Sequence, residues 1–128
     1  LSDSYALNGQ ADTALFYTNY AYQKQPENAM VAHQLGRIYG RYLNRLEEAI
    51  PYLQKAAQLN PSETTYLEDL GVAYGLLGKF DAVIETMNKL LQIKPNYKPA
   101  YLNMSISYRN KGDAAQADLY MKKAMELP

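Results

Sequence analysis

Apolar residues recur three and four positions apart along most of the chain, which is the spacing of helices with one buried face. Residues 67–74 carry one such stripe, and residues 83–91 carry a second one after Gly78. The same pair of stripes returns at residues 35–39 with 49–56, and again at residues 104–108 with 117–124. No stretch alternates apolar and polar residues for long, so the pattern predicts helices and no strands.

Turn-forming residues divide these helices at a fixed interval. Four prolines lie 33 to 35 residues apart, at Pro26, Pro61, Pro95 and Pro128. Three more series keep this period: Gly9, Asn44, Gly78 and Gly112; Tyr5, Tyr39, Tyr74 and Tyr108; and Ala14, Ala49, Val83 and Ala117. Asparagine at position 44 is expected to take the left-handed conformation that glycine takes at a helix end. The period therefore predicts stacked units, each made of a helix, a short turn and a second helix.

The motif inside each unit resembles that of the tetratricopeptide repeat (TPR) family. In the second unit this motif is carried by Leu35, Gly36, Tyr39, Ala49 and Pro61. The resemblance implies an all-α solenoid of antiparallel helix pairs, wound into a right-handed superhelix whose concave face is lined by the first helix of each pair. It covers the whole chain as one array, with a partial repeat at residues 1–25 and complete repeats at 26–60, 61–94 and 95–128. The partial repeat is expected to enter part-way along its leading helix and to turn at Gly9.

The second unit is one residue longer than the others. Asn44 stands five positions after Tyr39, whereas the glycine stands four positions after the tyrosine in each other unit. The extra residue therefore lies within residues 40–43. It either lengthens the turn or forms a π-bulge in the helix, a feature that often marks functional sites. In a functional interpretation, Arg41 and Tyr42 would be redirected toward the concave face.

Composition excludes several classes of function. Thirteen basic and thirteen acidic residues give a net charge of zero, which argues against nucleic acid and against an anionic membrane surface as partners. The chain has no cysteine and one histidine, and it has no glycine-rich phosphate-binding motif. No apolar run is long enough to cross a bilayer. The sequence therefore predicts no enzyme, no catalytic residue, no cofactor and no metal site, and it is compatible with either cytoplasm or periplasm.

The two ends of the sequence suggest a piece of a longer protein. The chain begins with leucine rather than methionine, so we expect it to be an excised segment. Asp118 stands where the other units carry an apolar residue, which is typical of the last repeat of an array. Apolar residues near the end of the chain, such as Leu119 and Met125, still offer a surface that a second copy could cover.

Binding of another protein is the leading hypothesis, because a preformed concave face can hold a peptide or a helical segment of a partner. The alternative is an architectural spacer or a self-associating module, possibly a homodimer through terminal apolar surfaces, within a larger protein such as an enzyme or a membrane protein. Helical spacing and the resemblance place these candidate residues on the concave face: Met30, His33, Gln34, Arg37, Arg41, Glu68, Asp69, Val72, Leu102, Asn103, Ile106 and Arg109. Tyr42, Tyr66 and Tyr101 are further candidates for ligand contacts.

One known TPR ligand is not expected. Some TPR domains hold the C-terminal Glu-Glu-Val-Asp of heat-shock chaperones with a clamp of Lys, Asn and Arg side chains. The corresponding positions here are His33, Arg37, Asp69, Pro99 and Asn103. Asp69 would repel the carboxylate that an asparagine should hold, so the sequence predicts no clamp for this tail.

Overall fold

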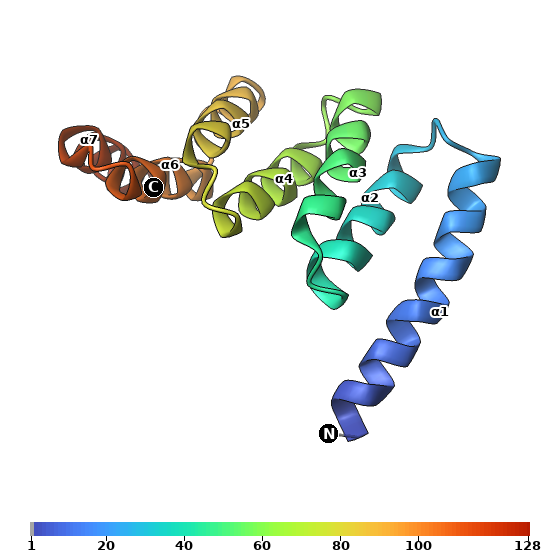
Figure 1. Cartoon of the computed structure of the whole chain (residues 1–128). Coiled ribbons are helices and arrows are strands. Elements are labelled where there is room, and N and C mark those ends of the chain that lie inside the picture. Colours follow the sequence, from blue (N-terminus) through green and yellow to red (C-terminus); the bar gives the residue numbers. More distant parts are fainter. Residues whose placement is uncertain (1) are drawn as a thin grey trace. The chain divides into compact units, whose positions relative to one another are not determined.

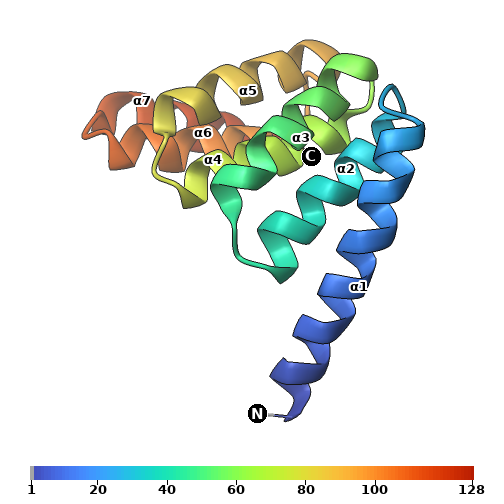
Figure 2. The same ribbon diagram turned by 45° about the vertical axis from the view of Figure 1, so that its right-hand side comes forward.

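The computed structural model describes the backbone of residues 2–128 and the side chains of residues 9–128. These residues form seven α-helices and one π-helix, without a strand, as the sequence predicts (Figure 1, Figure 2). The elements are α1 (Ser2–Lys24), α2 (Ala29–Arg37), η1 (Ile38–Tyr42), α3 (Leu46–Leu59), α4 (Thr64–Leu76), α5 (Phe80–Ile93), α6 (Lys98–Asn110) and α7 (Ala114–Met125). The chain divides into two compact units, residues 1–66 and residues 67–128, which are described separately.

The first unit is built around the antiparallel pair α2 and α3, with α1 packed beside α2 and η1. Leu35 of α2 is fully buried, as are Ala49 and Ala56 of α3. A Cβ atom on Gly36 would lie 2.6 Å from Leu53 Cδ2, so only a residue without a side chain lets the two helices approach this closely.

The first repeat differs from its prediction. Helix α1 runs from Ser2 to Lys24 without a turn at Gly9, and Thr13 Oγ1 donates a hydrogen bond to the Gly9 carbonyl oxygen across one helical turn. The predicted break at Gly9 was therefore wrong. The side chain of Tyr5, the first member of the tyrosine series, lies outside the described residues.

Leading helices of the complete repeats end in the same way. Gly78 and Gly112 have positive φ angles of 74° and 87°, and Asn44 has a φ of 55°, which confirms the prediction for the asparagine. In the two later repeats, the N–H group after the glycine donates to the carbonyl oxygen of the repeat's tyrosine, from Lys79 to Tyr74 and from Asp113 to Tyr108, both at 2.9 Å. This bond closes the helix end and starts the turn.

The extra residue of the second repeat is absorbed by the π-helix η1. Arg45 N still donates to the Tyr39 carbonyl oxygen, at 2.7 Å, although one more residue separates them than in the later repeats. Leu43 N donates to the Ile38 carbonyl oxygen five residues back, which is the π-helical spacing. Of the two alternatives predicted for the insertion, the π-bulge is the one observed. It widens the last helical turn and keeps the helix end in register.

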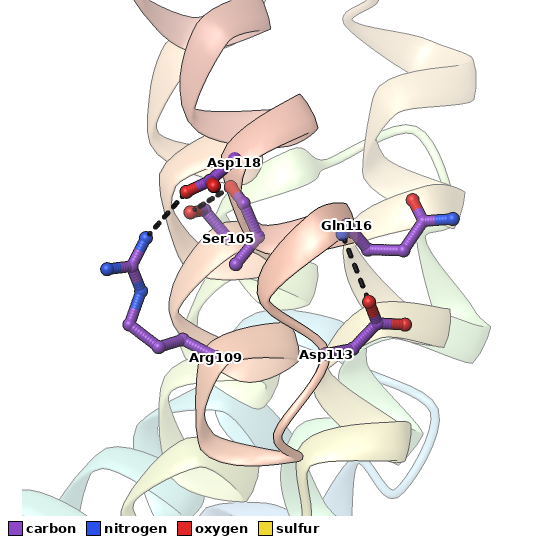
Figure 3. Close-up of polar contacts among 6 residues, drawn as sticks. Ser105, Arg109, Asp113, Gln116 and Asp118 are labelled. Carbon is purple, nitrogen blue, oxygen red and sulfur yellow. Dashed lines mark hydrogen bonds and ion pairs between the residues drawn. The ribbon is translucent and has the colours of Figure 1, made fainter.

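The second unit, residues 67–128, contains most of α4 and helices α5, α6 and α7. Its core is formed by Met87, Leu90 and Met104, which are fully buried. Ser105 occupies the position of Gly36 and Gly71, and its Oγ donates to the Ala117 carbonyl oxygen at 2.7 Å (Figure 3). The hydroxyl group is thus satisfied inside the contact between α6 and α7.

Helix α7 begins with a side-chain cap. Asp113 Oδ1 accepts a hydrogen bond from Gln116 N at 3.1 Å (Figure 3). The Tyr108 and Tyr120 rings stack with their centroids 5.4 Å apart, as the Tyr39 and Tyr52 rings do at 5.5 Å in the first unit. The tyrosine series therefore packs a leading helix against its trailing helix.

Candidate functional site

In the first unit, the leading helix presents one exposed face. Met30, Gln34, Arg37 and Arg41 follow one another at intervals of four, three and four residues, and all are exposed. Asn28 begins α2 by accepting hydrogen bonds from Met30 N and Val31 N through its Oδ1 atom. The predicted stripe on α2 and η1 is therefore a continuous surface with one thioether, one amide and two guanidinium groups.

His33 lies at the edge of this surface and is half-buried. The centroid of its ring is 4.7 Å from that of Tyr66, whose side chain packs with Ala32 and Ala56 in the core. Tyr66 was predicted as a ligand contact, and its burial shows that this prediction was wrong. Its register in the repeat places it on the leading helix, but the first turn of α4 points its ring into the preceding helix pair.

In the second unit, α4 exposes two aliphatic side chains one helical turn apart. Val72 was predicted to lie on the binding face, and Leu76, four residues later, is 68% exposed and was missed. The available signal was the adjacent pair Leu76 and Leu77, because only one of two consecutive helical residues can face the core. Glu68 and Asp69, also predicted, are half-buried at the start of this face.

On helix α6, Ile106 is exposed and occupies the same repeat position as Val72. Leu102 and Asn103 are half-buried, and Asn103 Nδ2 lies 3.8 Å from the Met87 sulfur. A bond to a thioether is weak, so the amide of Asn103 retains most of its hydrogen-bonding capacity for another group.

Arg109 is exposed in the last turn of α6. Its Nη2 atom lies 3.4 Å from Asp118 Oδ1 on α7, in an ion pair whose side chains are 61% and 79% exposed (Figure 3). Exposed ion pairs of this kind contribute little to stability, because water solvates the separated charges well. The guanidinium group of Arg109 can therefore exchange Asp118 for the carboxylate of a partner at little cost.

Two tyrosines at the start of α6 have internal hydrogen bonds. Tyr101 Oη donates to the Pro95 carbonyl oxygen at 2.7 Å, so its hydroxyl group stabilises the fold. The sequence had instead suggested that Tyr101 contacts a ligand. Tyr97 Oη donates to Glu68 Oε2 at 2.5 Å and joins the beginning of α6 to α4. Tyr42, the third predicted tyrosine, is exposed on η1 and is still a candidate.

The described side chains contain no cluster of metal-binding groups. Among them, no group of three or more His, Cys, Asp or Glu residues is placed to hold a metal ion. In the same part of the chain, no helix has the length and apolar character needed to span a membrane. What the leading helices offer instead is exposed aliphatic surface next to guanidinium and amide groups.

Comparison with known proteins decides the family. The model of the tetratricopeptide repeat matches residues 29–63, 65–97 and 99–128. This chain belongs to the tetratricopeptide repeat family. The matched segments are three repeats, and the residues before position 29 lie outside them.

Curated relatives share this TPR region. Aspartyl/asparaginyl beta-hydroxylase of Mus musculus is 29% identical over 86 residues, which are 67% of this chain and 12% of the hydroxylase. The SPINDLY protein of Hordeum vulgare, named as a UDP-N-acetylglucosamine–peptide N-acetylglucosaminyltransferase, is 31% identical over 119 residues, or 84% of this chain and 12% of that protein. The chain thus spans about an eighth of these relatives, and both are matched only through their TPR regions.

Solved TPR structures have the same fold. The MamA protein superposes with a TM-score of 0.85 at 28% identity, over 91% of this chain and 63% of MamA. YrrB, described as a TPR protein with an unusual peptide-binding site, superposes with a TM-score of 0.83 at 23% identity, over 96% of this chain and 63% of YrrB. At that identity, the likeness to YrrB concerns the fold alone. The TPR fold and its repeats make this chain a protein-interaction scaffold.

The hydrogen bond between Tyr97 and Glu68 leads to a pH-dependent prediction. Donation to the Glu68 carboxylate raises the pKa of Tyr97 above its ordinary value of 10.0, with a smaller contribution from desolvation. A raised pKa in the folded state stabilises the fold below about pH 10, and this stabilisation is lost as the pH rises through the folded-state pKa. We expect Tyr97→Phe to lower the free energy of unfolding by about 1 kcal/mol at neutral pH.

Urea unfolding of both proteins from neutral to strongly alkaline pH measures this effect. The difference between wild type and Tyr97→Phe should shrink as the solution becomes more alkaline than about pH 10. Tyr101→Phe removes a hydroxyl group bound to a neutral carbonyl oxygen and is the matched control. A difference at Tyr97 that stays constant across this range would contradict the assignment.

Proposed function

We propose that this chain binds a peptide or a helical segment of a partner protein on the exposed faces of its leading helices. The observation that carries the proposal is the exposure of aliphatic side chains at matching positions of two leading helices of the second unit, Val72 and Ile106, with Leu76 one turn beyond. Helix surfaces that meet only water usually carry polar residues at such positions. A partner side chain would remove this aliphatic surface from water.

The polar groups beside the aliphatic surface favour a partner that also carries carboxylates. Arg109 stands one turn after Ile106, and its ion pair with Asp118 is exposed and exchangeable. In the first unit, Arg37 occupies the repeat position of Val72 and Ile106, and Arg41 follows it. An arginine can bind a carboxylate through two parallel hydrogen bonds. A segment with an apolar anchor and an acidic side chain matches both kinds of group.

Preformed helices make such binding favourable for a flexible segment. The exposed faces in the first and second units lie on helices with fixed ends. Asn28 caps the beginning of α2, and glycine turns close α4 and α6. Little conformational freedom of the scaffold is therefore lost on binding, and the ordering cost falls mainly on the partner.

Selection from a random peptide library provides the probe for a test. A peptide that binds the chain is measured by calorimetry against the wild type and against Ile106→Ser, Val72→Ser and Arg109→Ala. We expect Ile106→Ser to weaken binding by about tenfold or more, because it removes an anchor contact. Ile93→Ser is the matched control, since Ile93 is an exposed isoleucine on the trailing helix α5.

The proposal fails if the selected peptides bind Ile106→Ser and Val72→Ser as tightly as the wild type. Affinity lost equally in the Ile93→Ser control would also contradict it, because that result would place the peptide on the trailing helices. A library that yields no binder would favour the alternative of an architectural spacer. Far-ultraviolet circular dichroism of each variant establishes that helical content is retained.

A further inference from the structure

Helix α1 has an exposed aromatic face on the side away from the rest of its unit. Ala11 is buried on α1, which packs against α2 and η1, whereas Phe16, Tyr17 and Tyr20 are 69%, 66% and 59% exposed. Figure 1 shows α1 beside α2 at the edge of the first unit. With about 100° of rotation per residue, positions 16 and 20 lie on the side of the helix opposite Ala11.

The repeat register shows that these aromatic residues are unusual. In the three complete repeats, the position of Tyr20 is a lysine each time: Lys55, Lys89 and Lys123. The position of Phe16 varies in character, with Pro51, Glu85 and Leu119. A position that is lysine in every complete repeat normally faces water. On α1 it carries an exposed aromatic ring instead.

A leading helix packed in front of α1 would not explain this face. In the complete repeats, the residues buried against the leading helix are Ala49, Val83 and Ala117, and the matching residue of α1 is Ala14. Ala14 is exposed, but it lies well over a quarter-turn away from Phe16 and Tyr20 around the helix. A helix that covered Ala14 as in the other repeats would leave the two aromatic rings in water.

The charges at the two ends of the aromatic face are complementary to each other. Asp12, Phe16, Tyr20 and Lys24 are spaced four residues apart and form one ridge of the helix, with the acid at one end and the base at the other. The Lys24 amine lies 5.4 Å from the centroid of the Tyr20 ring and so extends along this ridge. When a second α1 is laid antiparallel against the first, Asp12 faces the Lys24 of the second copy, and Phe16 faces its Tyr20.

We infer that two copies of this chain pair through the outer faces of their α1 helices, antiparallel and related by a two-fold axis. Such an interface is self-complementary: each charge contact and each aromatic contact occurs twice. Ridges of residues four apart pack into the matching grooves of a second helix in the commonest geometry of helix pairs. The pairing uses none of the residues of the leading-helix faces, so it is independent of the peptide binding proposed above.

Sedimentation equilibrium of the chain over a range of concentrations tests this inference. The wild type forms a dimer, and the double variant Phe16→Glu/Tyr20→Lys raises its dissociation constant by about tenfold or more. The introduced residues stand at the matching positions of the third repeat as Glu85 and Lys89, so the helix tolerates them. The control variant Leu119→Glu/Met125→Lys removes exposed apolar residues from α7 and leaves the dimer unchanged.

Charge reversal identifies the antiparallel register. Asp12→Lys and Lys24→Asp each weaken self-association, because each places like charges opposite one another at both ends of the interface. An equimolar mixture of these two variants restores dimers, since every Lys in one chain then faces an Asp in the other. Circular dichroism establishes that each variant keeps its helical content.

Several results would overturn the inference. A wild-type chain that stays monomeric at concentrations of about 0.5 mM excludes a specific homodimer of useful affinity. A dimer that survives Phe16→Glu/Tyr20→Lys, or that disappears in the α7 control, places the interface elsewhere. Single charge variants that associate like the wild type, or whose mixture does not associate, exclude the antiparallel arrangement.

Discussion

Replacing Leu90 by alanine is expected to lower the free energy of unfolding by about 3 kcal/mol, the largest effect of any truncation considered. The Leu90 side chain on α5 is 0% exposed, so its removal forfeits the burial of the side chain and leaves a cavity that the surrounding helices fill only in part. Urea unfolding followed by circular dichroism measures the change.

Leu76→Ala is the matched control for this substitution. Leu76 is also a helical leucine of the second unit, but it is 68% exposed, so its truncation is expected to change stability by less than about 0.5 kcal/mol. Equal losses at the two positions would contradict the assignment of Leu90 to the core and of Leu76 to the exposed surface.

A methyl group on Gly36 is expected to destabilise the first unit by about 2 kcal/mol, because it overpacks the contact between α2 and α3. The new Cβ would lie 2.6 Å from Leu53 Cδ2 and 2.7 Å from Leu53 Cγ. Since Cγ is close to the backbone, rotating the end of the leucine does not relieve the clash. The higher helix propensity of alanine recovers only about 1 kcal/mol.

Two other glycines provide comparisons for Gly36→Ala. A Cβ on Gly75 would lie 3.7 Å from Val83 Cγ2, an ordinary contact, so Gly75→Ala is expected to stabilise the helix by up to about 1 kcal/mol. At Gly71 the clash is with the terminal methyl group of Met87, which can move, so the loss there should be smaller than at Gly36. In thermal unfolding, the melting temperature should be highest for Gly75→Ala, lower for Gly71→Ala and lowest for Gly36→Ala. A stabilising Gly36→Ala would contradict the close approach.

Much of the fold could be predicted because turn-forming residues recur at the helix ends of each repeat. The period, the helix-ending residues and the apolar spacing together predicted the three complete repeats, down to the left-handed Asn44. The choice between a longer turn and a π-bulge could not be made, because it depends on whether Arg45 N reaches the Tyr39 carbonyl oxygen. The missing break at Gly9 is of the same kind, because a glycine at the motif position does not by itself show whether the backbone leaves the helix there.

The candidate site was predicted less completely than the fold. Helical spacing predicted Met30, Val72 and Ile106 to lie on outward faces of α2, α4 and α6, and their side chains are exposed. It did not show that Glu68 is engaged by Tyr97, which comes from the following repeat. Contacts between residues of different repeats depend on how the helices stack, and a pattern read within one repeat does not contain them.

The central claim is that partners bind the leading-helix faces. Methyl nuclear magnetic resonance of the chain with a library-selected peptide tests this claim most directly, because exposed methyl groups occur on both kinds of helix. We expect the signals of Val72, Leu76 and Ile106 to shift on titration, while those of Ile93 and Leu119 on the trailing helices stay in place. Shifts confined to the trailing helices, with the leading-helix methyl groups unchanged, would contradict the account.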